Sequence, residues 1–284
     1  MSVEHYENFP VASWLSPPAL RPAVTAIYQF ARTADDIADE GPASAAERML
    51  QLSLYRDALL RAASGGDTSG AWQPVFAPLA AAIAAHRLPL NLLTDLLSAF
   101  AQDTGNPRYA DRAALLDYCA RSANPIGRLL LHLSHVNDGD ALVQSDAICT
   151  ALQLINFWQD LSIDLPRGRI YVTEADAARA GLLLSQLSAH RDSDATRALV
   201  QSLVDWAREL MHAGAPLVHR LAGRLGWELR FVVQGGLRVL EKIEASGCNA
   251  LSRRPLIGKG DLPITTWRAL RMRSALPPPT VLQR

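Results

Sequence analysis

The spacing of the apolar residues constrains the fold of this chain more than any other feature of the sequence. Alanine and leucine dominate, and apolar residues recur three and four positions apart along almost the whole length. The sequence lacks the runs of alternating β-branched residues that are typical of half-buried strands. An apolar share of 49% is ample for a buried core. The sequence therefore predicts an all-α protein.

Glycine, proline and asparagine divide this pattern into helical segments. We expect helices over residues 19–40, 44–63, 75–87, 89–103, 111–123, 126–136, 142–165, 193–222 and 227–246. Neither a fixed-length repeat nor a flexible linker is visible, so we expect a single domain over residues 1–275. We expect the proline-rich tail that follows, residues 276–284, to be flexible.

Charge and cysteine content exclude several classes of protein. Lysine and arginine number 28, equal to aspartate and glutamate, so there is no electrostatic reason to expect a nucleic-acid partner. The longest stretch without charged residues or histidine, 68–85, contains two prolines and does not predict a membrane span. The N-terminus lacks the pattern of a signal peptide, so we expect a cytoplasmic protein. Its 3 cysteines show no metal or disulfide spacing, and we expect them to be reduced core residues.

The predicted helix 19–40 carries a polar stripe that a core does not explain. At 100° per residue, the stripe falls within an arc of about 60°. Its members are Tyr28, Arg32, Asp35 and Asp39. The neighbouring residues are apolar, which predicts that protein covers the helix around most of its circumference.

A second polar stripe lies on the predicted helix 142–165 and falls within an arc of about 80°. Its members are Gln153, Asn156, Asp160 and Asp164. This helix is apolar enough to be central in a bundle. An unpaired carboxylate stripe facing a dry interior would cost several kcal/mol per ion, so we expect a compensating charge.

A hard cation would supply that charge. Mg²⁺ takes one or two carboxylates, several waters and phosphate oxygens. The predicted metal ligands are Asp35, Asp39, Asp160 and Asp164. The expected substrate group is a diphosphate, to which Arg32, Arg169 and Tyr171 would donate hydrogen bonds.

Simpler interpretations stand beside this one. A single Asp-x-x-x-Asp pair is usually a solvated helix face, and Asp36 and Glu40 could simply extend an acidic surface toward solvent. Two pairs, each within a polar stripe on an apolar helix, favour a binding site. We expect the aromatic residues Phe30, Phe157, Trp158, Trp227 and Phe231 to be core residues. If they instead line a cavity, their π faces would suit a cation.

At these two segments the sequence resembles the squalene/phytoene synthase family. Segment 32–39 is similar to the family's first aspartate-rich motif, and segment 156–164 with 169–171 is similar to the second. The resemblance extends from His5 to about residue 270. It implies an isoprenoid-synthase helical bundle with a central cavity. It also implies Mg²⁺ ions that bridge Asp35/Asp39 and Asp160/Asp164 to a prenyl diphosphate.

Three stretches, 5–13, 118–128 and 156–160, are similar to one branch of the family that acts in bacterial hopanoid biosynthesis. This resemblance implies ionisation of presqualene diphosphate, rearrangement of the cation, and quenching by water to give hydroxysqualene. Condensing relatives usually carry arginine where this chain has Gln159, and Val-Ala-Gly-x-Val-Gly where it has 122–127. Our hypothesis is that binding one diphosphate instead of two requires less positive charge.

The remaining roles stay open at this level. Tyr28, Asn124, Gln153 and Asn156 are candidates to orient the substrate or the quenching water. The main alternative activity is head-to-head condensation of two allylic prenyl diphosphates to presqualene diphosphate, squalene or phytoene. A non-catalytic helical assembly factor and a lipid carrier are further alternatives. The C-terminal basic region with Trp267 and Leu270 could contact the inner face of the cytoplasmic membrane peripherally or form a solvated helix. The resemblance also implies functional coupling to other hopanoid-pathway enzymes.

Overall fold

The computed structural model describes residues 18–272. Every regular element in that range is a helix, which confirms the predicted all-α class. The N-terminal stretch 5–13 and the tail 276–284 lie outside the described residues, and the single domain over 1–275 stays a prediction.

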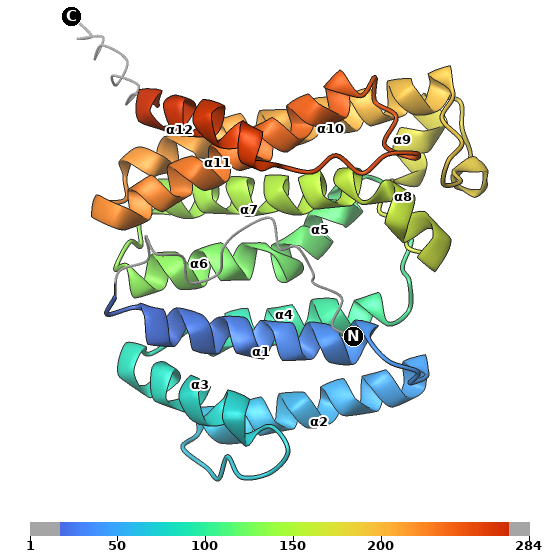
Figure 1. Cartoon of the computed structure of the whole chain (residues 1–284). Helices are drawn as coiled ribbons and strands as arrows, with labels where there is room; N and C mark the ends of the chain where they lie inside the picture. The colour runs from blue at the N-terminus through green and yellow to red at the C-terminus, as the bar shows by residue number, and fades with distance from the viewer. Residues whose placement is uncertain (1–17, 273–284) are drawn as a thin grey trace, which may run out of the picture.

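The helices form stacked layers (Figure 1). Helices α2 (Ala45–Ala63) and α3 (Gln73–His86) form one edge, followed by α1 (Arg21–Asp39) and α4 (Leu90–Asp103), then by α6 (Asn124–Leu133) and α5 (Arg112–Ser122). Helix α7 (Gly139–Gln159) crosses the middle, and α10 (Asp194–Gly214), α11 (Gly223–Ala245) and α12 (Leu262–Arg271) form the opposite edge. The shorter elements are α8 (Leu161–Asp164), η1 (Leu165–Arg167), α9 (Glu174–Arg179), η2 (Leu184–Gln186), η3 (Ala215–His219) and η4 (Lys259–Asp261).

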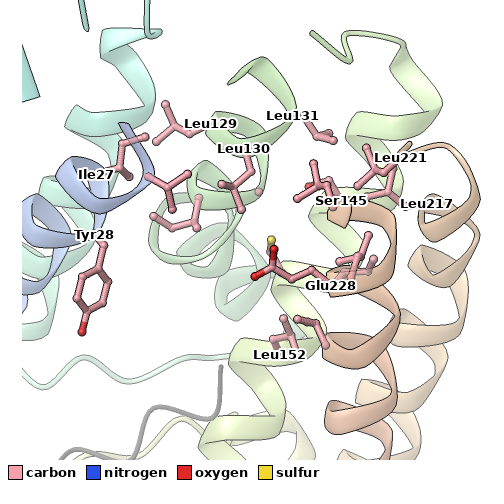
Figure 2. Close-up of a pocket in the computed structure, with 18 of the residues that line it drawn as sticks. Ile27, Tyr28, Leu129, Leu130, Leu131, Ser145, Leu152, Leu217, Leu221 and Glu228 are labelled. Atoms are coloured by element: carbon pink, nitrogen blue, oxygen red, sulfur yellow. The ribbon is translucent and has the colours of Figure 1, made fainter. Parts of the chain in front are cut away.

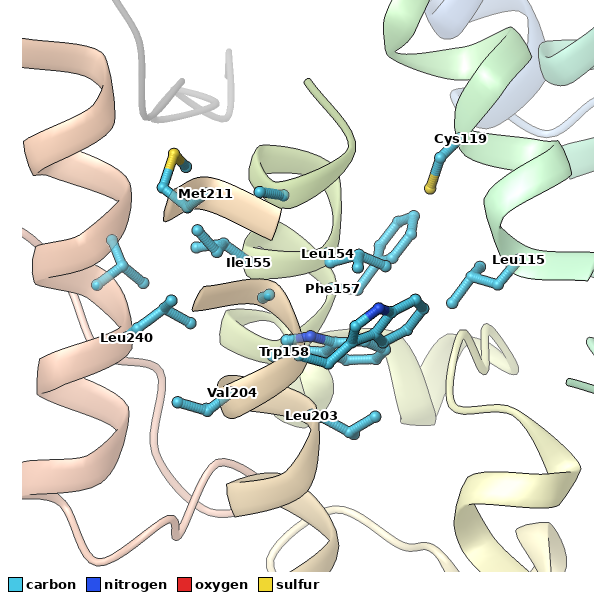
Figure 3. Packing of buried hydrophobic residues seen from close by; sticks show 14 of the residues in the cluster. Leu115, Cys119, Leu154, Ile155, Phe157, Trp158, Leu203, Val204, Met211 and Leu240 are labelled. Atoms are coloured by element: carbon cyan, nitrogen blue, oxygen red, sulfur yellow. The ribbon is translucent and has the colours of Figure 1, made fainter. Parts of the chain in front are cut away.

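Two hydrophobic clusters hold these layers together. One joins helices α1 to α4 and α6, and at its centre the rings of Phe30, Tyr55 and Phe76 pack together. The other surrounds Trp158 of α7, which is fully buried among side chains of α5, α10 and α11 (Figure 3). Helix α7, which carries Gln153 and Asn156 of the second polar stripe, therefore lies at the centre of the molecule.

Helix α10 approaches α7 more closely than most side chains would allow. At Gly214 a Cβ atom would lie 2.5 Å from Ile148 Cγ1 and 2.6 Å from the Gln144 carbonyl oxygen. Glycine is required here because any side chain would push the two backbones apart. The contact fixes the position of α7 relative to the layer above it.

Two predicted helices are interrupted in the structure. Segment 142–165 is interrupted at Asp160, where α7 ends and α8 begins, so its polar residues do not share one continuous helix. Segment 193–222 leaves the α-helical form after Gly214. Pro216 explains the second change, because its ring lacks an N–H and clashes with the carbonyl one turn earlier. Helices α9 and α12 were not predicted.

The expectations for aromatic residues and cysteines are confirmed in part. Phe30, Phe157 and Trp158 are core residues, but the prediction was wrong for Trp227 and Phe231, which are 40% and 36% exposed. They lie near the start of α11, where α12 ends, as the hydrogen bond from Arg230 to the Ala269 carbonyl shows. The three cysteines are free, as expected, although Cys149 is only half-buried.

No helix within residues 18–272 combines the length and apolar character that crossing a bilayer requires.

Candidate active site

The two predicted acidic segments meet where α1 and α7 end. Asp39, at the last position of α1, accepts a hydrogen bond from Arg169, which follows η1. The negative charge of Asp39 also contributes to the raised pKa of Asp164 on α8, so these carboxyl groups lie within electrostatic range of each other. The structure thus brings together side chains that are more than a hundred residues apart in the sequence.

On α1, Arg32 is surrounded by carboxylates. Its guanidinium lies 2.7 Å from Asp36, 3.2 Å from Glu40 and 3.4 Å from Asp35. Asp36 and Glu40 therefore take part in this ion-pair cluster. Burial, followed by repulsion from Asp39, raises the pKa of Asp35 to about 6, although Arg32 opposes the shift.

On the α7 side, Asp160 lies in the break between α7 and α8. Arg254 donates two hydrogen bonds to its carboxylate, at 2.5 and 3.1 Å, and the Asn156 side-chain amide donates a third at 3.3 Å. Asp164 lies one turn further along. Burial and repulsion from Asp160 raise the pKa of Asp164 to about 6, whereas Arg169 opposes the shift.

The sequence did not indicate a fifth carboxyl group, Asp103, at the end of α4. The Tyr118 hydroxyl donates a 2.8 Å hydrogen bond to its Oδ2, while its Oδ1 is buried without a hydrogen-bond partner. Burial, together with repulsion from Asp39 and Asp35, raises the pKa of Asp103 to about 7 against the effect of the Tyr118 hydrogen bond. A lone aspartate at a helix end gives no pattern by which it could have been recognised.

Tyr171 forms part of an aromatic wall beside this acidic group. Its ring stacks on Phe157 with an interplanar angle of 5°, and the rings of Tyr109 and Tyr118 lie about 6 Å away. Burial raises the pKa of the Tyr171 hydroxyl, and the charges of Asp103 and Asp164 add to the shift. The Tyr171 hydroxyl is therefore protonated at neutral pH and can donate a hydrogen bond.

An apolar cavity of about 390 Å³ is lined in part by α1 and α7, the helices that carry the two polar stripes (Figure 2). It lies between α1, α6, α7, η3 and α11, and most of the side chains that line it are aliphatic. Tyr28 and Leu152 belong to its lining and precede Arg32 and Asn156 by one helical turn. The hydrocarbon-lined cavity therefore begins about one helical turn from Arg32 and Asn156.

Two other predicted contact residues lie apart from this lining. Asn124 is buried at the start of α6, where its side-chain oxygen accepts a 2.9 Å hydrogen bond from the Thr150 hydroxyl of α7. Gln153 is half-buried on α7. Neither residue belongs to the cavity lining, and their contact with a substrate stays a prediction.

The acidic residues fit a divalent cation that a diphosphate helps to hold. Within residues 18–272 there is no group of three or more histidine, cysteine or acidic side chains that could hold a metal ion by itself. However, the charge of Asp39 on α1 contributes to the raised pKa of Asp35, of Asp103 on α4 and of Asp164 on α8, and Asp103 has an unpartnered buried oxygen. Such a group is short of positive charge. Mg²⁺ needs only one or two carboxylates when phosphate oxygens and waters complete its shell.

Curated proteins similar to this chain include several hydroxysqualene synthases. The protein from Sinorhizobium fredii is 33% identical over 238 residues, covering 84% of this chain and 78% of the relative. That from Rhodopseudomonas palustris is 33% identical over 240 residues, covering 84% and 80%. That from Zymomonas mobilis is 40% identical over 182 residues, covering 62% and 59%.

Solved structures of the same kind share the fold. The squalene synthase HpnC from Alicyclobacillus acidocaldarius is 37% identical, with a TM-score of 0.79 over 86% of this chain and 90% of that one. A dehydrosqualene synthase with 21% identity superposes with a TM-score of 0.75, which shows the fold alone. A family model for squalene/phytoene synthase matches residues 3–261. The chain therefore belongs to the squalene/phytoene synthase family.

Proposed function

We propose that this chain is a hydroxysqualene synthase that acts on presqualene diphosphate. The carbon–oxygen bond to the diphosphate breaks, and both electrons leave with the diphosphate. The resulting cyclopropylcarbinyl cation rearranges, and a water oxygen adds to it and loses a proton, which gives hydroxysqualene. The observation that carries the proposal is a cluster of carboxylates and arginines at the ends of α1 and α7, on the same two helices that line a hydrocarbon cavity, in a chain similar to several hydroxysqualene synthases.

The cluster of carboxylates and arginines would bind the diphosphate. We propose that Mg²⁺ is held there, directly or through water, by Asp35, Asp39, Asp160 and Asp164. When bound, Mg²⁺ neutralises charge that develops on the leaving diphosphate. Arg32 and Arg169 lie among these carboxylates and can turn their remaining N–H groups toward phosphate oxygens. The protonated Tyr171 hydroxyl is a third donor.

The apolar part of the cavity would hold a prenyl arm and keep nucleophiles away from the cation. Tyr28 lies on α1 between the aliphatic lining and Arg32, in a position to contact the substrate near its diphosphate. Asn156 lies at the corresponding level of α7 and bonds to Asp160. We propose that these two residues orient the substrate or the quenching water.

Two variants test the metal assignment. Asp35→Asn and Asp160→Asn keep the size of the side chain but remove its charge, so each is expected to abolish turnover of presqualene diphosphate with little loss of helicity. Asp57→Asn, at an exposed position on α2, is the matched control and should keep wild-type turnover. Retained activity in both site variants would remove the assignment.

Product analysis separates this activity from condensation. Incubation with presqualene diphosphate in ¹⁸O-labelled water should give hydroxysqualene that carries the label, as read by mass spectrometry. Incubation with farnesyl diphosphate alone, with and without NADPH, should give neither presqualene diphosphate nor squalene. Turnover of farnesyl diphosphate at a rate matching that of presqualene diphosphate would favour the condensing alternative.

We further propose functional coupling to other hopanoid-pathway enzymes, which would supply presqualene diphosphate or consume the product.

We also propose a peripheral contact between α12 and an anionic membrane. On α12, Trp267 and Leu270 are 53% and 63% exposed, and the Arg271 guanidinium lies 4.3 Å from the Trp267 ring. Exposed tryptophan beside arginine suits a lipid headgroup region. Co-sedimentation with anionic liposomes should fall when Trp267 and Leu270 are both replaced by serine. Unchanged binding would reject this contact.

A further inference from the structure

The segment that joins α11 to α12, residues 246–261, passes beside the end of α7 (Figure 1). Two consecutive residues at the end of α7 bind two consecutive residues of this segment. The Gln159 side-chain amide donates a 2.5 Å hydrogen bond to the Pro255 carbonyl oxygen. The Asp160 carboxylate accepts two hydrogen bonds from Arg254, at 2.5 and 3.1 Å. Because the two contacts involve neighbouring residues on both sides, a shift of one would move the other.

Gln159 fixes this segment at the residue next to Arg254. The backbone of the segment is also fixed on either side, because the His190 N–H donates to the Leu251 carbonyl and the Lys242 ammonium donates to the Leu256 carbonyl. Gln159 is fully buried and adds a contact between these two points, close to the guanidinium that binds Asp160. Without an amide at position 159, the backbone that carries Arg254 would lose this contact and gain freedom.

Arg254 has hydrogen-bond donors left for an anion. A guanidinium carries five N–H groups in a planar fork. Arg254 uses Nε and Nη2 on Asp160, whereas its Nη1 has no hydrogen-bond partner within residues 18–272. The Arg254 side chain is 29% exposed and that of Asp160 is 16% exposed, so water and ligands can reach the pair. Nη1 can therefore donate to an oxygen of a diphosphate that binds beside Asp160.

We propose that Gln159 is a positioning residue that holds Arg254 against Asp160 and thereby strengthens the binding of the substrate's diphosphate. Ordering a long arginine side chain costs conformational entropy. When the backbone beside Arg254 is already fixed, part of this cost is met during folding and not during binding. The proposal rests on the proposed function, because the anion is the diphosphate of the prenyl substrate.

The test is a double-mutant cycle of Gln159→Met, which keeps the length of the side chain but has no donor, and Arg254→Met. Arg253→Met, at the exposed neighbouring position, is the matched control. Calorimetry gives the Kd for farnesyl thiolodiphosphate, an analogue that resists ionisation, in the presence of Mg²⁺. Arg254→Met is expected to raise this Kd about thirtyfold and Gln159→Met about tenfold, while Arg253→Met leaves it unchanged. The double variant should bind no more weakly than Arg254→Met alone, because Gln159 acts through Arg254.

A purely structural role of Gln159 gives a different result. Gln159→Met would then weaken binding by the same factor whether residue 254 is arginine or methionine, and this outcome would overturn the proposal, as would an unchanged Kd in Arg254→Met. If Gln159→Met does not fold, Gln159→Leu takes its place in the cycle with the same two outcomes.

The same measurements separate this proposal from the proposed function. A wild-type protein that binds the analogue but leaves presqualene diphosphate unchanged would contradict the proposed function. An additive cycle in an enzyme that turns over presqualene diphosphate would contradict only the role of Gln159. Absence of binding by the wild type would overturn both.

Discussion

Asp103→Asn is expected to stabilise the metal-free protein at alkaline pH and not at acidic pH. The pKa of Asp103 is about 7, against an ordinary value of 3.8, because the group is buried and lies near Asp39 and Asp35. The native state therefore binds this proton more tightly than the unfolded chain does. The stability that the proton contributes is fully present below about pH 4 and is lost as the pH rises through about 7.

The size of this stability difference follows from the raised pKa of Asp103. A pKa that rises from 3.8 to about 7 corresponds to at most about 4 kcal/mol of unfolding free energy, and screening by solvent in the cleft reduces this to about 2 kcal/mol. At about 2–4 °C per kcal/mol for a chain of this size, the difference in Tm between variant and wild type should grow by about 4–8 °C from acidic to alkaline pH. Asparagine keeps an acceptor for Tyr118, so the shape of the site is preserved.

The assay is thermal unfolding followed by circular dichroism in the presence of a chelator, at about pH 4 and about pH 8. Asp117→Asn, on the outer side of α5 with its side chain 73% exposed, is the control and should show no pH-dependent gain. A difference in Tm between Asp103→Asn and wild type that is the same at both pH values would refute the reasoning. It would mean that Asp103 does not carry its proton in the folded state.

Four further variants can be tested by urea unfolding or by NMR. Gly214→Ala should lower the free energy of unfolding by about 1–3 kcal/mol, because its Cβ would lie 2.6 Å from a carbonyl oxygen of α7. Gly235→Ala, where only ordinary contact at 3.9 Å awaits a Cβ, should instead raise it by about 0.5–1 kcal/mol. Asp261→Asn should cost about 1–3 kcal/mol at neutral pH. Burial opposes ionisation of Asp261, but hydrogen bonds from a lysine, a backbone N–H and an arginine lower its pKa to about 2, so this difference should vanish as the pH falls from about 4 to about 2. Tyr118→Phe should raise the pKa of Asp103 further, measured by NMR titration, because the hydrogen bond to its carboxylate is lost.

Local pattern was enough to predict the helical class and much of the site. The segments 44–63 and 89–103 match α2 and α4 to within one residue at each end, because turn residues flank a clear apolar period. The polar stripe on α1 depends on positions within one helix. Its residues Arg32 and Asp35 are therefore brought together as the spacing predicts, with 3.4 Å between their charged groups.

Contacts between distant segments could not be predicted in this way. Asp103 belongs to the acidic group only because α4 ends beside α1 and α5, and no spacing in its own helix indicates this. Glu228 lines the cavity because α11 packs beside α7, whereas in the sequence it follows an exposed tryptophan. Helix α12 was missed because apolar residues on its outer face, such as Leu270, disturb the expected period.

The charge balance around Gln159 depends on such a distant contact. Gln159 is fully buried, and its side-chain amide donates a 2.5 Å hydrogen bond to the Pro255 carbonyl. That bond fixes the segment whose preceding residue, Arg254, binds Asp160. An arginine at position 159 would bury a second guanidinium close to the first, and a buried charge without its own partner costs about 3–5 kcal/mol. The glutamine at 159 and the arginine at 254 therefore act together. The positive charge beside Asp160 comes from Arg254, which lies outside segment 156–171. The absence of an arginine at position 159 therefore does not by itself leave this part of the site without positive charge.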